Sequence, residues 1–154
     1  MRTNTQFTVS VQMMILYAVS DGQRLTSKGI ALRTGCHPVM VRQLFGKMKR
    51  AGLLRVSAGK GITALARDPG EITLWDIYAA VEESDVSSLF LFHENIYGES
   101  SEDRCFKAVL SEHLSDALQA VRESMEQVTL AQLAEEFRAK IGAGEEAEGG
   151  DPPE

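Results

Sequence analysis

The stretch from Leu25 to Ala51 constrains this chain most, because it contains the signals for two short helices joined by a tight turn. Thr26 is a residue type that caps the N-terminus of a helix. Gly35 stands where the first helix needs a residue with positive φ. Pro38 suits the first position of the second helix, because that position needs no backbone N–H. This arrangement predicts a helix-turn-helix, whose second helix enters the major groove of DNA.

The second predicted helix, over 38–51, has one apolar and one polar side. Apolar residues at spacings of i, i+3, i+4 and i+7 are typical of a helix face that packs on a core, and here they are Val41, Leu44, Phe45 and Met48. The opposite side carries cations and polar groups. On this outward side we expect Val39, Gln43, Gly46 and Arg50, flanked by Arg42 and Lys47.

The two halves of the chain carry opposite charge. Residues 1–70 hold eleven Lys and Arg and two acids, a net charge of +9, whereas residues 71–154 hold five Lys and Arg and twenty acids, a net charge of −15. The total of −6 would by itself argue against nucleic acid as a partner. The separation of charge instead predicts one half that faces nucleic acid and one that faces something else.

A short hairpin is expected directly after the helix-turn-helix. Leu53–Ser57 and Ile62–Leu65 are apolar segments with glycines between them. A helix-turn-helix followed by a hairpin is a winged helix. We expect the wing to place Lys60, at its apex, against a phosphate or in the minor groove. A wing this short should position the domain on DNA more than it reads the base sequence.

Further helices are predicted over Phe7–Val19, over 74–83 after a capping Thr73, over Glu102–Gln127, and from Thr129 onward. The longest has a continuous apolar seam of roughly 35–40 Å, which the basic half cannot easily cover. Packing within the monomer is one alternative. A second copy of the same helix covers the seam better and predicts a two-fold dimer. The expected dimerisation residues are Leu110, Leu114, Ala117, Leu118, Val121 and Met125.

The predicted fold class is mainly α with a small β-hairpin wing, a winged helix-turn-helix joined to a long dimerisation helix. We expect a DNA-binding domain over 1–68, a helical dimerisation and sensor region over 69–141, and a disordered acidic tail over 142–154. No apolar run approaches the roughly 20 residues that span a bilayer, and the N-terminus lacks the apolar centre of a signal peptide. Two cysteines 69 positions apart form no disulfide framework, so we expect a cytoplasmic protein and no membrane partner.

Three segments give the chain a resemblance to a known family: VRQLFGKMKRAGLL (41–54), LARDPGEITLWDIYAAVE (65–82) and FHEN (92–95). In order and spacing they resemble the Rrf2 family of bacterial winged-helix transcriptional regulators, which includes IscR, NsrR and CymR, and in particular its cysteine-poor YwnA-like members. The resemblance covers roughly residues 7–140. It implies a dimer with a long crossing helix and DNA bound by the helix that starts at Pro38.

The resemblance also implies contacts for single residues. Gln43 can bond an adenine edge, Arg42 a guanine or a phosphate, and Val39 a thymine methyl. Ser27 and Lys28, at the N-terminus of the preceding helix, should meet phosphate. The complete set of predicted contacts to double-stranded DNA is Thr26, Ser27, Lys28, Pro38, Val39, Arg42, Gln43, Lys47, Arg50 and Lys60.

The chain departs from the cluster-binding relatives, which place three cysteines between the helix that starts at ITL (72–74) and the long helix. Here that region holds only Cys105, with His93 as the one other soft ligand nearby. Iron–sulfur clusters normally take four ligands, mostly thiolates. We therefore expect no [2Fe–2S] or [4Fe–4S] cluster, no other cofactor and no metal site.

Two hypotheses remain open for the signal that this protein senses. A small-molecule effector could fill an apolar pocket near Trp75, Tyr78, Phe90, Phe92 and His93, although packing is the simpler role for Trp75 and Tyr78. Alternatively Cys105, beside Arg104 near a helix start, could act as a thiol sensor. An inert thiol is the simpler interpretation.

The leading hypothesis is a dimeric, sequence-specific DNA-binding transcriptional regulator, acting as a repressor. The alternative is a protein-interaction adaptor in which the winged helix docks a protein and its cations keep it soluble. An enzyme is not expected. No nucleophile with its base, no Gly-rich phosphate loop and no metal-spaced cluster appears, and the three histidines lie in separate elements.

Overall fold

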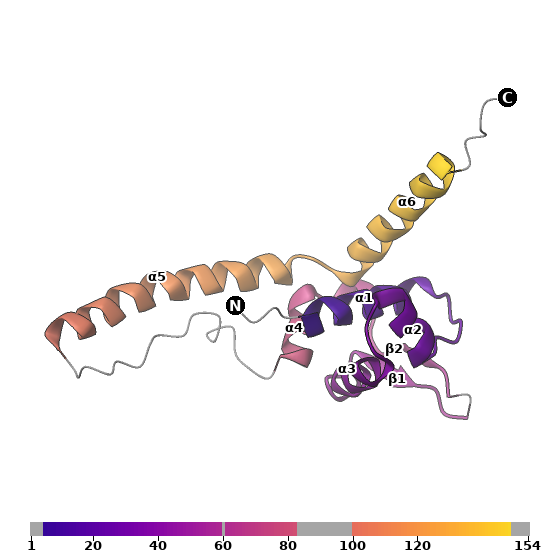
Figure 1. Ribbon diagram of the computed structural model, residues 1–154, viewed down its shortest axis with the longest axis horizontal. Coiled ribbons are helices and arrows are strands. Elements are labelled where there is room, and N and C mark those ends of the chain that lie inside the picture. The colour runs from indigo at the N-terminus through magenta and orange to yellow at the C-terminus, as the bar shows by residue number, and fades with distance from the viewer. Residues whose placement is uncertain (1–4, 60, 83–99, 149–154) are drawn as a thin grey trace.

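The computed structural model describes residues 5–59, 61–82 and 100–148. Figure 1 shows a compact body of helices and a hairpin from which two long helices diverge. This architecture confirms the predicted fold class. The elements in chain order are α1 (Thr5–Val19), α2 (Ser27–Thr34), α3 (Pro38–Arg50), β1 (Leu54–Val56), β2 (Thr63–Leu65), the 3-10 turn η1 (Pro69–Glu71), α4 (Leu74–Val81), α5 (Ser101–Glu126) and α6 (Leu130–Glu148).

The turn between α2 and α3 forms for the local reasons that the sequence indicates. The Thr26 hydroxyl accepts a hydrogen bond from the Gly29 N–H at 3.0 Å and caps α2. Gly35 ends α2 with a φ of 70°, a left-handed conformation that glycine adopts without steric cost. Pro38 then opens α3 at its first position. The predicted helix-turn-helix is therefore present.

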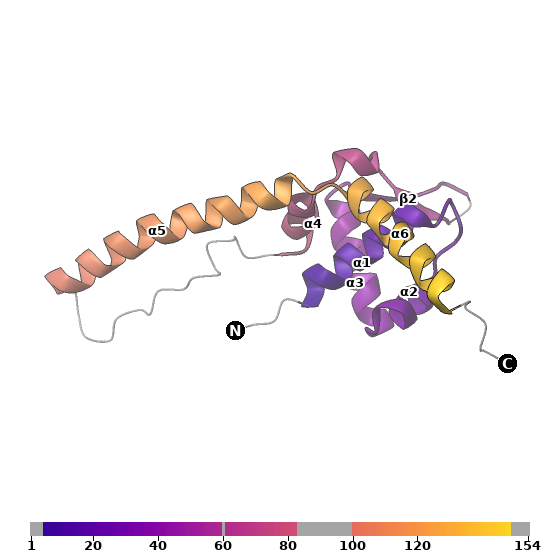
Figure 2. The same cartoon turned by 90° about the horizontal axis from the view of Figure 1, so that it is seen from above.

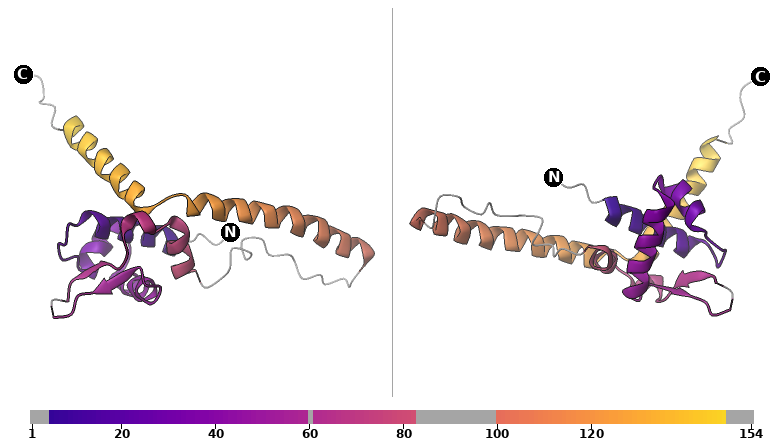
Figure 3. Two further views of the ribbon diagram at one scale, coloured as in Figure 1. Left: turned by 180° about the vertical axis from the view of Figure 1, so that it is seen from behind. Right: turned by 60° about the horizontal axis from the view of Figure 1, so that its bottom comes forward.

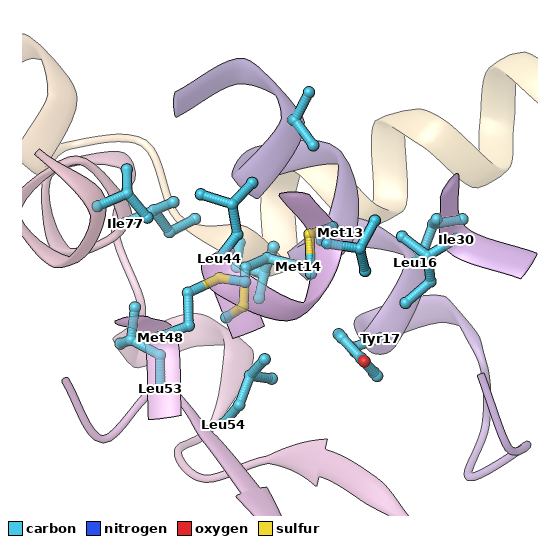
Figure 4. Close-up of a cluster of buried hydrophobic side chains, with 14 of the residues drawn as sticks. Met13, Met14, Leu16, Tyr17, Ile30, Leu44, Met48, Leu53, Leu54 and Ile77 are labelled. Atoms are coloured by element: carbon cyan, nitrogen blue, oxygen red, sulfur yellow. The ribbon is translucent and has the colours of Figure 1, made fainter. Parts of the chain in front are cut away.

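The core lies where α1 meets the other short helices. Met13 and Met14 of α1 are fully buried, as are Leu44 and Met48 of α3 and Ile77 of α4. Figure 4 shows these side chains meeting at the centre of the body. The inward stripe of α3 is thus confirmed, and burial of this stripe fixes which side of α3 stays outside.

The hairpin is antiparallel, with Leu54 opposite Leu65 and Val56 opposite Thr63. Its strands begin one residue later than predicted, because Leu53 is buried and leads out of α3. The hairpin packs against α1 through β2. Burial raises the pKa of the Tyr17 phenol in α1, and the nearby Thr63 side chain partly offsets this rise. The predicted apex, Lys60, lies outside the described residues.

Helix α4 begins after the predicted cap, Thr73, which forms a capping box with Asp76. Thr73 and Asp76 exchange hydrogen bonds of 3.0 and 3.1 Å between side chain and backbone. The start of α6 is fastened to the start of α4, because the Leu130 N–H donates to the Ile72 carbonyl at 2.7 Å and the Leu74 N–H to the Val128 carbonyl at 2.9 Å. From this point α6 packs along α1.

Helix α6 also begins as predicted but ends later. Gln132 and Thr129 form a second capping box, with the Thr129 N–H donating to the Gln132 side chain at 2.9 Å. The helix then continues to Glu148. The predicted disordered tail over 142–154 is therefore wrong for 142–148, where alanine and glutamate, both good helix formers, outweigh two glycines.

Helix α5 projects away from the body along most of its length, as Figure 2 shows from above and Figure 3 from behind. Its 26 residues correspond to about 39 Å, which agrees with the predicted long helix. Among the described residues, no helix is both long and apolar enough to cross a membrane.

Candidate nucleic-acid interface

The outward side of α3 is cationic and contains no acid. Arg42, Gln43 and Arg50 are exposed on it, and Val39 has 44% of its surface exposed. An open hollow of about 450 Å³ follows this side, lined by Gln6, Arg42, Gln43, Gly46, Lys47 and Arg50. The structure therefore brings most of the predicted α3 contacts together on one accessible surface.

Lys47 differs from the other cations of α3. Its ammonium donates to the Val81 carbonyl at 3.0 Å and to the Gln6 side chain at 3.4 Å. Val81 is the last residue of α4. A carbonyl at a helix C-terminus lacks an intrahelical partner and attracts a cation. Lys47 thus joins α3 to the end of α4, a role that the sequence analysis did not anticipate.

We expect Lys47→Met to lower stability without weakening the electrostatic attraction to DNA. Methionine keeps an unbranched apolar side chain but cannot donate to the Val81 carbonyl. The free energy of unfolding should fall by about 1 kcal/mol. The slope of log affinity against log salt should stay as in the native protein, because the Lys47 ammonium is already held by the Val81 carbonyl and the Gln6 side chain. Thermal unfolding and mobility shift at several salt concentrations measure the two effects. A slope reduced by about 0.9 per copy would instead make Lys47 a phosphate contact.

The predicted contacts on α2 lie at its N-terminus. Lys28 is exposed and Ser27 half-buried, while the hydroxyl of Thr26 already caps the helix. Such an N-terminus presents unpaired N–H groups and a partial positive charge. Lys28 and the first turn of α2 therefore form a second positively charged site, next to α3.

The N-cap of α3 is His37, which the sequence analysis missed. Its Nδ1 accepts a hydrogen bond from the Val39 N–H at 3.2 Å. Histidine is not among the residues most preferred at this position. The available signal was its place directly before Pro38, since proline prefers the first helical position.

The predicted effector residues Trp75 and Tyr78 lie in an aromatic contact between helices. Their rings stack with centroids 5.3 Å apart. Phe7 of α1 meets Tyr78 edge-on at 5.5 Å, and the Arg122 guanidinium of α5 lies 5.0 Å over Trp75. These contacts join α1, α4 and α5 and agree with the packing role. The other members of the predicted pocket, Phe90, Phe92 and His93, lie outside the described residues.

The apolar seam of α5 is open over much of its length. The exposed fractions of Leu110 and Val121 are 48% and 44%, and Ala117 is exposed, while Leu114, Leu118 and Met125 are half-buried. The sequence analysis missed one residue that extends the seam toward the start of α5, Phe106, with an exposed fraction of 64%. Val109 is also exposed, by 58%, but lies about 100° round the helix from Leu110. The spacing of Phe106 four residues before Leu110 was the available signal.

A helix-turn-helix with a cationic second helix and a β-hairpin behind it defines the winged-helix class of nucleic-acid-binding domains. The sequence model of the Rrf2 family, described as an iron-dependent transcriptional regulator, matches residues 3–136. The chain belongs to the Rrf2 family. Membership places it among transcriptional regulators rather than enzymes, which confirms the resemblance and the predicted class.

Individual relatives agree with this assignment. YwnA of Bacillus subtilis (strain 168), named as an HTH-type transcriptional regulator, is 33% identical over 87 residues, which are 56% of this chain and 64% of YwnA. The structure of CymR, named as the global cysteine regulator of B. subtilis, has a TM-score of 0.62 at 25% identity and covers 88% of this chain and 97% of its own. The structure of T. potens IscR has a TM-score of 0.65 at 22% identity, over 89% of this chain and 88% of its own. The match with YwnA spans just under two thirds of that protein.

The family is described as iron-dependent, so the two cysteines of this chain are its candidate iron ligands. Cys105 is exposed on α5, whereas Cys36 is half-buried in the turn before α3, with its Sγ 3.0 Å from the Thr34 hydroxyl. They lie in separate elements. Over 5–59, 61–82 and 100–148 no three His, Cys, Asp or Glu side chains converge as metal ligands. The donors in these ranges do not fit an iron–sulfur cluster, which is bound mostly by thiolates.

Proposed function

We propose that two copies of this chain bind a roughly palindromic DNA operator and repress transcription from it. The observation that carries the proposal is the exposed side of α3, which presents Arg42, Gln43 and Arg50 with no acid on the helix. A bound dimer would occupy promoter DNA and exclude other proteins from it. Because the operator lies on the chromosome, we propose a cytoplasmic location.

Base recognition is assigned to the first half of α3. Arg42 can donate two hydrogen bonds to guanine, Gln43 can bond adenine, and the exposed Val39 can contact a thymine methyl. Lys28 and Arg50 are assigned to phosphates, because Lys28 is an exposed cation in the first turn of α2 and Arg50 is one at the end of α3. Ser27, Pro38 and the wing residue Lys60 remain predicted backbone contacts, which position the helix without specifying sequence.

Dimerisation is assigned to α5. Its exposed apolar residues lie along a helix that stands away from the body, as Figure 2 shows. A contiguous apolar surface of this kind is costly in water and typical of an interface. A second copy of α5 buries it with two-fold symmetry and supplies the second half-site contact that a palindrome requires.

We propose that the regulator works without an iron–sulfur cluster, in keeping with the separate positions of its two thiols. Its signal is assigned to the region of Trp75 and Tyr78, where α1, α4 and α5 meet. A small apolar molecule that separates these rings would change how α4 sits against α3, since Lys47 bonds the end of α4.

The proposal is tested by mobility shift on a duplex that the native protein selects from a random-sequence library. Lys28 and Arg50 from each of two copies provide four phosphate contacts, so log affinity should fall with log salt at a slope of about −3.6. We expect affinity to fall by about a hundredfold between about 50 and 200 mM salt. A nearly flat salt dependence would contradict DNA binding through this surface. Capture of a protein partner at one-to-one stoichiometry, without any DNA shift at low salt, would favour the adaptor alternative.

A further inference from the structure

One of the two ring nitrogens of His37 holds the start of α3. The ring lies at the N-cap of α3, with φ −78° and ψ 141°, and its Nδ1 accepts the Val39 N–H at 3.2 Å. An imidazole nitrogen accepts a hydrogen bond only when it carries no proton. The ring that caps α3 is therefore neutral, and its single N–H proton is on Nε2.

The other ring nitrogen, Nε2, is left as the donor of the His37 side chain. Both nitrogens are bonded to Cε1, but only Nδ1 is engaged by the helix; His37 is exposed, and Nε2 has no hydrogen-bond partner within the described parts of the chain. The first turn of α3 contains no acid, and Val39 beside the ring is 44% exposed. The ring thus presents one neutral donor at the positive end of the α3 dipole, beside the proposed base contacts.

We propose that His37, as the neutral Nε2–H tautomer, donates a hydrogen bond to a phosphate oxygen of the DNA backbone where α3 enters the groove. The proposal rests on the proposed function. One side chain then has two tasks: Nδ1 holds the first turn of α3, and Nε2 fixes the position of that turn along the duplex. Because the contact is with a phosphate and the ring is neutral, it adds affinity without sequence preference and without releasing a counterion.

The variant His37→Ser separates the two tasks. A serine hydroxyl is among the best N-caps, so it keeps the bond to the Val39 N–H, but nothing remains in the place of Nε2. We expect affinity to fall about tenfold for each half-site, equally on the selected duplex and on a random duplex. The unfolding temperature and the salt slope should match the native protein. His37→Ala, which removes both bonds, should show the same loss of affinity together with a lower unfolding temperature.

Several results would overturn the proposal. Native affinity in His37→Ser would make His37 a cap alone. A loss confined to the selected duplex would make it a base contact, and a salt slope reduced by about 0.9 per copy would make it a cation. Each of these outcomes leaves DNA binding intact. Failure of the native protein to shift any duplex at low salt would instead refute the proposed function, and this inference with it.

Discussion

The double variant Leu110→Glu/Leu114→Glu is expected to be a folded monomer that no longer binds the operator tightly. The two positions are one helical turn apart on the seam of α5, and neither belongs to the buried core. Two carboxylates there would lose their hydration if a second α5 covered them, which costs several kcal/mol. A single subunit contacts only one half-site, so affinity for the selected duplex should fall at least a hundredfold, since the second contact is no longer intramolecular.

Sedimentation velocity, circular dichroism and mobility shift check the three parts of this prediction. The matched control is Ser111→Glu/Ser115→Glu, which adds the same charges at the same spacing on exposed positions one residue further round α5. This control should stay dimeric and bind DNA. A dimer in the seam variant would show that subunits associate elsewhere, and a native protein that is already monomeric would contradict the proposed dimer altogether.

Local sequence signals account for much of the fold. Thr26, Gly35, Pro38 and Thr73 each act within a few residues of their position, so both bounds of α2 and the starts of α3 and α4 could be predicted. The end of α4 was predicted at residue 83, whereas the helix ends at Val81. The side of α3 that faces outward followed from periodicity, because the same four apolar residues that pack inward fix the opposite side. The candidate interface was thus largely present in the sequence.

Contacts between distant residues could not be predicted in this way. Lys47 appeared to be one more outward cation, yet it bonds Val81, 34 residues away. No periodic pattern specifies that the end of α4 lies beside it. The bond between Leu130 and Ile72, which fastens α6 to the body, is of the same kind. The end of α6 could not be predicted for a different reason. The helix continues through two glycines, because the alanines and glutamates around them favour helix.

The double variant Arg42→Ala/Arg50→Ala is expected to stay dimeric and lose most of its DNA affinity. Both side chains are exposed on α3 and line the hollow there, and neither lies in the core or on α5. Removing Arg50 from two copies deletes two phosphate contacts, so the salt slope should fall by about 1.8. At low salt we expect at least a hundredfold weaker binding of the selected duplex, because loss of a base contact at Arg42 adds about 1–3 kcal/mol per half-site.

Mobility shift over a salt series and sedimentation velocity on the same preparation check this result. Lys140→Ala is the matched control, since it removes an exposed cation from α6, away from α3. Lys140→Ala should change neither the slope of log affinity against log salt nor the mass of the dimer in sedimentation. A monomeric Arg42→Ala/Arg50→Ala protein would refute the separation between a DNA-binding surface on α3 and a dimerisation surface on α5. If the salt slope of the variant equals that of the native protein, the electrostatic part of binding does not depend on the cations of α3. The DNA would then contact another surface.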